Sequence, residues 1–174
     1  MTVQKFIQWS TTALVLSGLF EILASFQNLA HWMLSISAVA GWVLLIIGFA
    51  GLHARQVHKT GWFGYVGLGL LFIGTALSLL PYVVGSNLLS NSLFLSTNGK
   101  RIAFLLFETS LVAQVGYFLY GLSSLRVRVL PQVINYLLII SVILMIISGI
   151  FGQGLSTAAI GILLRRNDAL AQAA

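Results

Sequence analysis

Long apolar runs separated by short polar segments dominate the chain. A membrane-spanning helix takes about 20 mostly apolar residues. Four runs reach that length, at residues 6–27, 33–52, 62–84 and 102–125. The pattern therefore predicts an all-α, polytopic transmembrane helix bundle, with a single domain over residues 1–174.

The fifth apolar run, residues 133–164, has an ambiguous length. As one helix it would measure about 48 Å, which is long for a hydrocarbon core of about 30 Å, yet it is short for two crossings. Three glycines lie between residues 149 and 154, where a turn or kink is expected. We predict a short last hairpin of residues 133–148 and 150–165, giving six crossings. Five crossings, with a long kinked last helix, is the alternative.

The distribution of cations predicts the orientation, because cytoplasmic loops carry an excess of Lys and Arg. With a cytoplasmic N-terminus and six crossings, seven cations lie inside and two, Lys100 and Arg101, lie outside. With five crossings the counts become five and four. The bias favours a cytoplasmic N-terminus, six crossings and a multi-pass location in the inner (plasma) membrane. The inside cations are Lys5, Arg55, Lys59, Arg126, Arg128, Arg165 and Arg166. All of them except Lys5 are also expected to contact lipid phosphates.

Two further segments lie outside the apolar runs. The connection of residues 85–100 is rich in Ser and Asn but keeps several leucines, so it is either an amphipathic piece in the outer interface or a plain loop. The small, polar residues 167–174 are expected to form a frayed tail.

Composition supports the membrane class and excludes several others. The chain is 59% hydrophobic and only 7% charged, against about 25% charged residues in soluble domains. It has no cysteine, so disulfides, iron–sulfur clusters and thiolate zinc sites are excluded. Its cations are scattered between apolar runs, which does not fit a nucleic-acid surface. Because sequence signatures of common enzymes are also absent, we predict no enzymatic activity, no metal site and no cofactor.

Three loop segments carry a resemblance. Residues 51–56 read Gly-Leu-His-Ala-Arg-Gln, residues 61–64 read Gly-Trp-Phe-Gly, and residues 126–131 run from Arg to Leu-Pro. In these features the chain resembles a broad group of small, uncharacterised prokaryotic multi-span integral membrane proteins, usually with about six helices. The resemblance implies a topology. It transfers no functional residues, because the group has no assigned activity.

Two acidic residues lie within the predicted spans, Glu21 and Glu108. Burying an ionisable group in a membrane is costly, so each is a functional hypothesis. At 1.5 Å per residue, both lie about 10 Å below the outer boundary. The sequence predicts an outer-leaflet polar cavity lined by Glu21, Ser25, Thr75, Ser78 and Glu108, which would hold a cation, a proton or a polar head group. The alternative is that each glutamate is neutral or simply hydrogen-bonds a neighbouring helix.

Small and aromatic residues leave the partner question open. The 17 glycines predict close helix packing, but they do not distinguish packing within one chain from docking onto a partner. Trp42 and Tyr117 lie at mid-depth, where they either fill the bundle interior or face a partner or lipid.

Three functions are consistent with these features. The first is a non-catalytic accessory or structural subunit of a protein complex, packing with other transmembrane subunits, with itself or with lipid. The second is a small transporter or ligand-sensing membrane protein that uses the cavity around Glu21 and Glu108. The third is pigment or haem binding through His53.

Overall fold

A computed structural model describes residues 2–26, 31–84 and 97–173 of the chain. Within those helices, the side chains of residues 31, 32, 34, 35, 80–84, 97–110 and 171–173 lie outside the description. The connection predicted to be either interfacial or a loop falls mostly in residues 85–96, outside the described ranges.

The described residues form six α-helices. Their bounds are α1 Val3–Ala24, α2 His31–Ala54, α3 Trp62–Val84, α5 Thr97–Val127, α6 Gln132–Ser148 and α7 Ile150–Ala173. Three of these helices contain stretches long and apolar enough to cross a membrane, namely Val3–Ala24, Ile36–Ala54 and Trp62–Leu79, and Gln132–Ser148 is a shorter apolar helix. The all-helical class predicted from the apolar runs is therefore confirmed.

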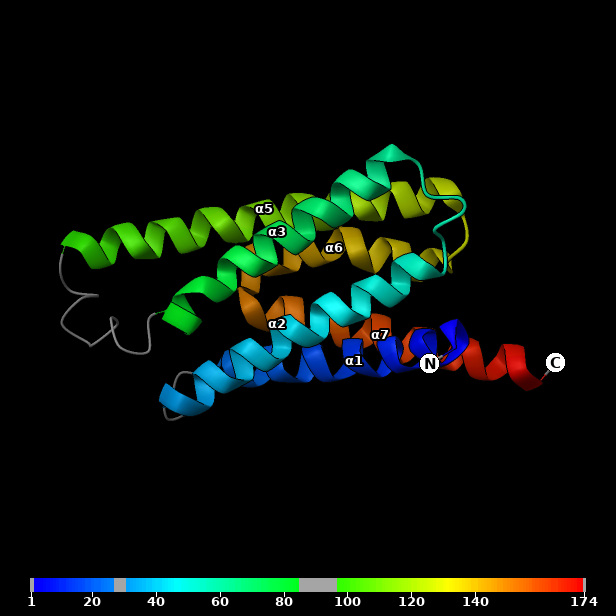
Figure 1. Cartoon of the computed structure of the whole chain (residues 1–174), viewed down its shortest axis with the longest axis horizontal. Helices are drawn as coiled ribbons and strands as arrows, with labels where there is room; N and C mark the ends of the chain where they lie inside the picture. Colours follow the sequence, from blue (N-terminus) through cyan, green and yellow to red (C-terminus); the bar gives the residue numbers. More distant parts are fainter. Residues whose placement is uncertain (1, 27–30, 85–96, 174) are drawn as a thin grey trace.

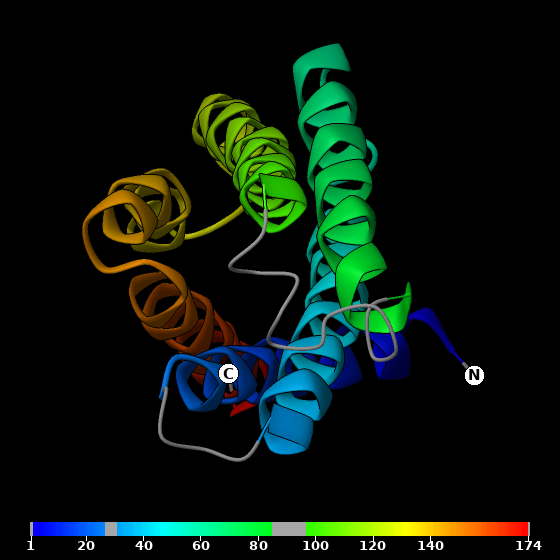
Figure 2. The same cartoon turned by 90° about the vertical axis from the view of Figure 1, so that its left-hand side faces the viewer.

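The helices run alternately in opposite directions and close into a ring (Figures 1 and 2). Going round the ring, α1 packs on α2, α2 on α3, α3 on α5, α5 on α6, α6 on α7, and α7 back on α1. The pairs α1–α2, α3–α5 and α1–α7 are the closest, and α2–α3 is the loosest. Within the described part of the chain, α1 does not pack on α3 or α5, so groups on those helices meet only through side chains that reach into the ring.

The break between α6 and α7 lies at Gly149. This residue has φ +61° and ψ −146°, a conformation that L side chains rarely adopt. A Cβ at Gly152 would press on Leu144, so the two helices fold back on each other immediately after the turn. The predicted turn within residues 149–154 is confirmed, and the single long, kinked last helix is not formed.

Glycines let the closest helix pairs touch backbone to backbone. A Cβ at Gly18 would lie 2.5 Å from the Ala158 nitrogen of α7. A Cβ at Gly67 would lie 2.6 Å from the Tyr120 nitrogen of α5, and one at Gly116 would lie 2.7 Å from the Leu71 Cα of α3. These glycines pack against helices of the same chain. The sequence had left open whether they serve packing within the chain or docking onto a partner, and at these positions it is packing within the chain.

Aromatic side chains fill the middle of the ring. Phe49 of α2 meets Tyr117 and Tyr120 of α5 edge to face, with ring centroids 4.9 and 5.8 Å apart. Tyr117 is fully buried and Trp42 is buried in the same apolar core. Both therefore belong to the interior rather than to a lipid or partner surface.

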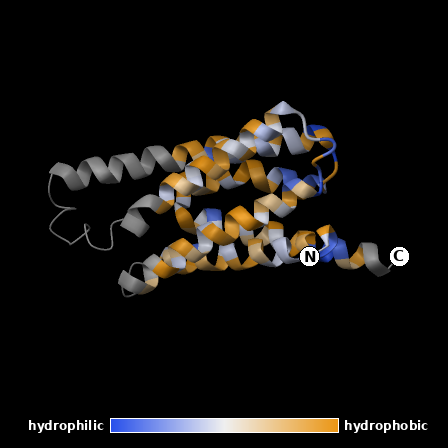
Figure 3. Ribbon diagram, in the orientation of Figure 1, coloured by the Kyte–Doolittle hydropathy of each residue, from blue (hydrophilic) through white to orange (hydrophobic). Residues whose placement is uncertain are grey.

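Hydrophilic residues gather at the end of the bundle where α2, α5 and α7 terminate (Figure 3). Here Arg55 makes two hydrogen bonds to Asp168, Nη1 to Oδ1 at 2.6 Å and Nη2 to Oδ2 at 2.7 Å. The expected frayed tail is therefore wrong. The α7 helix continues to Ala173, and this ion pair attaches its last turns to the segment after α2.

Candidate functional site

Glu21 is buried in the wall of the ring, one turn before α1 ends. Its exposed fraction is 2%. Gly41 of α2 and Gly154 of α7 flank it, because a Cβ at Gly41 would lie 3.5 Å from Glu21 Cγ and one at Gly154 would lie 3.0 Å from Glu21 Cβ. The two glycines leave the room that a carboxylic side chain needs between three closely packed helices.

Ser17, one turn before Glu21 on α1, connects the carboxyl group to α2. Its hydroxyl donates to the Gly41 carbonyl oxygen at 2.9 Å, and its Oγ also lies 3.1 Å from Glu21 Oε1. A serine hydroxyl has a single proton to donate. While Ser17 donates to Gly41, a hydrogen bond between Ser17 and Glu21 requires a proton on the Glu21 carboxyl. Whether the Ser17–Glu21 hydrogen bond can form together with the Ser17–Gly41 bond thus depends on the protonation state of Glu21.

Two glutamines and a tyrosine extend the polar cluster across the ring. Gln114 Nε2 of α5 donates to Gln153 Oε1 of α7 at 3.2 Å. Gln153 Nε2 lies 3.4 Å from Tyr117 Oη, which is a long donor–acceptor distance, and Gly154, the residue after Gln153, packs against Glu21. The cluster therefore joins α1, α2, α5 and α7. Apart from the Glu21 carboxyl group, its side chains carry only hydroxyl and amide groups.

Several oxygens of this region have no hydrogen-bond partner among the described residues. They include Glu21 Oε2, Gln114 Oε1 and Thr157 Oγ1, the last from the residue one turn after Gln153. Buried polar atoms are nearly always paired with protein or water. Unpaired oxygens beside a carboxyl group leave positions for a proton, a water molecule or a small polar solute.

A groove on the outside of the ring reaches this cluster. It lies between α5 and α6, has a volume of about 470 Å³, and is lined by Leu111, Gln114, Val115, Phe118, Val142, Met145 and Ile146. Gln114 is the one polar residue in that lining, and it is also part of the interior cluster. A ligand in the groove would therefore contact the polar interior through Gln114.

The structure places the sequence-predicted residues as follows. Ser25 and Ser78 donate to carbonyls of the preceding turn, Ile22 at 2.6 Å and Gly74 at 2.8 Å. Thr75 is buried on α3, and its Oγ1 has no partner in the described ranges. None of these three is hydrogen-bonded to Glu21. Glu108 lies on α5, but its side chain is outside the described residues, so its part in the predicted cavity stays a prediction.

Sequence reasoning missed Gln114 and Gln153. Each is an uncharged amide within a long apolar run. Such a residue is costly to leave without a hydrogen-bond partner in a membrane, and it can join two helices by hydrogen bonding. That signal was available. The sequence did not show that the two glutamines face each other.

The basic residues and His53 lie at the hydrophilic end. Arg55 is bound by Asp168, whereas Arg128, Arg165 and Arg166 are exposed. Lys59 and Arg126 line a second pocket. His53 packs edge-on against Tyr65, with ring centroids 5.0 Å apart.

No family model, curated protein or solved structure matches this chain significantly.

Proposed function

We propose that this chain is a small, non-catalytic, multi-pass protein of the cell inner (plasma) membrane that acts as a transporter or sensor, and that Glu21 is the group that binds and releases a proton. Its six helices would each cross the membrane, with the N-terminus in the cytoplasm. Supporting this orientation, the cations at the ends of α2, α5 and α7 fall on one side of the bundle, as cytoplasmic cations do.

The observation that carries the proposal is the environment of the Glu21 carboxyl group. It is buried between three helices, one of its oxygens is unpaired among the described residues, and its neighbours are uncharged hydroxyl and amide groups. A carboxyl group that only joined helices would have hydrogen-bond partners for both of its oxygens. An ionisable group within the membrane and without a fixed counter-charge is instead typical of proton pathways.

Proton flux in liposomes tests the proposal. The purified protein is reconstituted with a pH-sensitive dye inside, and a potassium diffusion potential drives protons inward. We expect the wild type to acidify the lumen and Glu21→Gln to abolish the flux, because the amide has nearly the same shape but cannot release a proton. Ser17→Ala should reduce the flux, since it removes the hydroxyl that contacts both Glu21 and Gly41.

Ser141→Ala is the matched control. Ser141 is a buried serine on α6 whose hydroxyl donates to Leu138 of its own helix at 2.7 Å and forms no hydrogen bond with a described residue of the cluster. The Ser141→Ala variant should conduct protons as the wild type does. Equal flux in the wild type and Glu21→Gln, or no flux above empty liposomes, would contradict a proton-transporting role.

An accessory subunit is the second candidate. Its support is the apolar face beside the α5–α6 groove, where Ile143, Ile146 and Ile147 of α6 are exposed. This role predicts stable co-purification of another transmembrane subunit from native membranes, together with flux that does not depend on Glu21.

A further inference from the structure

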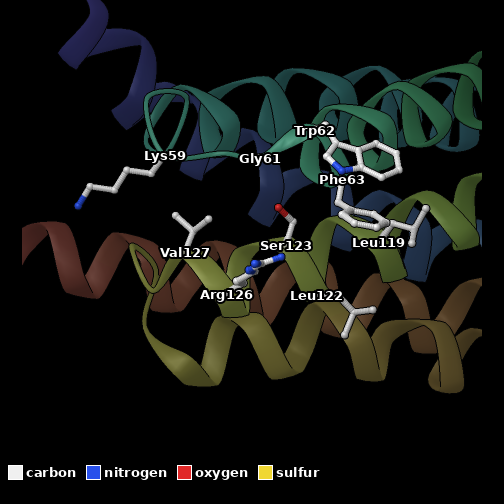
Figure 4. A pocket seen from close by; sticks show the side chains of 9 residues that line it. All are labelled: Lys59, Gly61, Trp62, Phe63, Leu119, Leu122, Ser123, Arg126 and Val127. Atoms are coloured by element: carbon white, nitrogen blue, oxygen red, sulfur yellow. The ribbon is translucent and has the colours of Figure 1, made fainter.

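A pocket of about 660 Å³ opens at the hydrophilic end of the bundle, away from the Glu21 cluster. It lies between the segment after α2, the first turn of α3 and the last two turns of α5 (Figure 4). Its lining residues are Lys59, Gly61, Trp62, Phe63, Leu119, Leu122, Ser123, Arg126 and Val127. The pocket begins where the candidate span Trp62–Leu79 begins, so in a membrane it would lie at the interface between head groups and acyl chains.

The charge of the pocket is uniformly positive. Lys59 and Arg126 are exposed, and neither forms an ion pair within the described part of the chain. No carboxylate lines the pocket, and Asp168, the acidic residue at this end of the bundle, is bound by Arg55. The pocket therefore favours an anion.

The rest of the lining is apolar. Trp62 and Phe63 stack with ring centroids 3.9 Å apart, and Trp62 remains 66% exposed. Leu119 and Leu122 of α5 continue the apolar wall toward the middle of the bundle (Figure 4). An exposed tryptophan at the end of a span is typical of the membrane interface, where one side of the ring meets head groups and the other meets acyl chains.

We infer that this pocket binds one anionic phospholipid. Its phosphate would lie beside the Arg126 guanidinium, and an acyl chain would lie against Leu119, Leu122 and the Phe63 ring. The Lys59 side chain, which points away from Arg126 in Figure 4, would turn toward the bound phosphate. The pocket volume is within the range of ordinary small-molecule sites and is sufficient for a head group with the upper part of a chain. The inference rests on the proposed membrane location but is independent of the role of Glu21.

Native mass spectrometry of the detergent-solubilised protein tests the charge requirement. The protein is titrated with phosphatidylglycerol and, separately, with zwitterionic phosphatidylcholine. The wild type should retain one phosphatidylglycerol in preference to phosphatidylcholine. Lys59→Gln and Arg126→Gln should each weaken phosphatidylglycerol binding about fivefold, the effect of removing one cation near an anionic lipid. Arg165→Gln removes an exposed cation of α7 that does not line the pocket, and it should bind as the wild type does.

A steric variant tests the pocket itself. Gly61 lines the pocket, a Cβ added to it would have no neighbouring atom within 4 Å, and its φ is not positive. Gly61→Leu should therefore fold normally and place a side chain at the opening of the pocket. Gly69 of α3 is equally open but lies outside the lining, which makes Gly69→Leu the matched control. We expect Gly61→Leu to lose the phosphatidylglycerol and Gly69→Leu to keep it.

Three outcomes would overturn the inference. Equal binding of the two lipids would exclude head-group selection. If Arg165→Gln weakened phosphatidylglycerol binding as much as Arg126→Gln, the effect would depend on net charge and not on the pocket. Displacement of the lipid by glycerol phosphate at equal concentration would show that the acyl chain contributes nothing and that the ligand is a soluble anion. A chain found in the soluble fraction of cells would instead contradict the proposed membrane location.

Discussion

Replacing Gly18 by alanine is expected to destabilise the bundle by separating α1 from α7. The added methyl group would lie 2.5 Å from the Ala158 nitrogen and 2.7 Å from the Ala158 Cβ. The nearer distance is about 0.9 Å short of an ordinary contact, and the obstacle is backbone that cannot rotate away. The two helices must therefore move apart.

The magnitude follows from that displacement. A gap of about 0.5–1 Å forfeits between a quarter and a half of the dispersion energy of each contact it opens, and overpacking of this kind costs about 1–3 kcal/mol. We expect about 2 kcal/mol for Gly18→Ala, which is about 30-fold in the unfolding equilibrium constant. Gly69→Ala is the control. Its methyl group would have no neighbour within 4 Å, so it should be neutral or slightly stabilising.

Reversible unfolding in mixed micelles, followed by circular dichroism, measures both variants. The comparison also tests the α1–α7 packing in the absence of other subunits, because purification separates the protein from them. If Gly18→Ala were as stable as Gly69→Ala in the isolated protein, the close α1–α7 contact would be refuted.

Three further changes report on other parts of the fold. Asp168→Asn removes the negative charge and one of the two oxygens that accept from Arg55, and it should cost about 1 kcal/mol, seen as faster amide hydrogen exchange in the last two turns of α7; unchanged exchange would show that the pair does not hold the tail. Arg128→Gly should raise the unfolding free energy by about 0.5–1 kcal/mol, because Arg128 has φ +54° where α5 ends, and a lower thermal midpoint in detergent would contradict this. Tyr120→Phe leaves Gln56 Nε2 with Ser124 alone and should cost about 1 kcal/mol in the same unfolding assay, whereas no change would mean that the Gln56 bond adds nothing.

Much of the fold could be predicted from the sequence, because the length of each apolar run predicts the length of the helix that it forms. The expected runs 62–84 and 133–148 agree with α3 Trp62–Val84 and α6 Gln132–Ser148 to within a residue. The turn at Gly149 was recognisable because few residues other than glycine adopt its backbone angles. The helical tail after residue 166 was not recognisable, since its order depends on Arg55, more than a hundred positions earlier in the chain.

The candidate site was predictable only in part. Glu21 stood out because a carboxyl group in an apolar run is rare. Its depth along α1 could be counted, but its neighbours depend on which helices adjoin α1 and how each is rotated. The ring places α2 beside α1 and sets α3 apart, so the carboxyl group contacts Ser17, which is bonded to Gly41 of α2, rather than Thr75 or Ser78.

The central claim is that the Glu21 carboxyl group exchanges a proton, and infrared spectroscopy of the C=O stretch tests it most directly. The chain has only three acidic residues, so isotope labelling of glutamate leaves two labelled carboxyl groups, and Glu21→Gln assigns the band of Glu21. In reconstituted wild-type protein we predict a protonated-carboxyl band that is lost in Glu21→Gln, disappears as the pH rises and shifts in D₂O. A Glu21 band that neither titrates nor shifts in D₂O, or the absence of such a band at every pH, would contradict the claim.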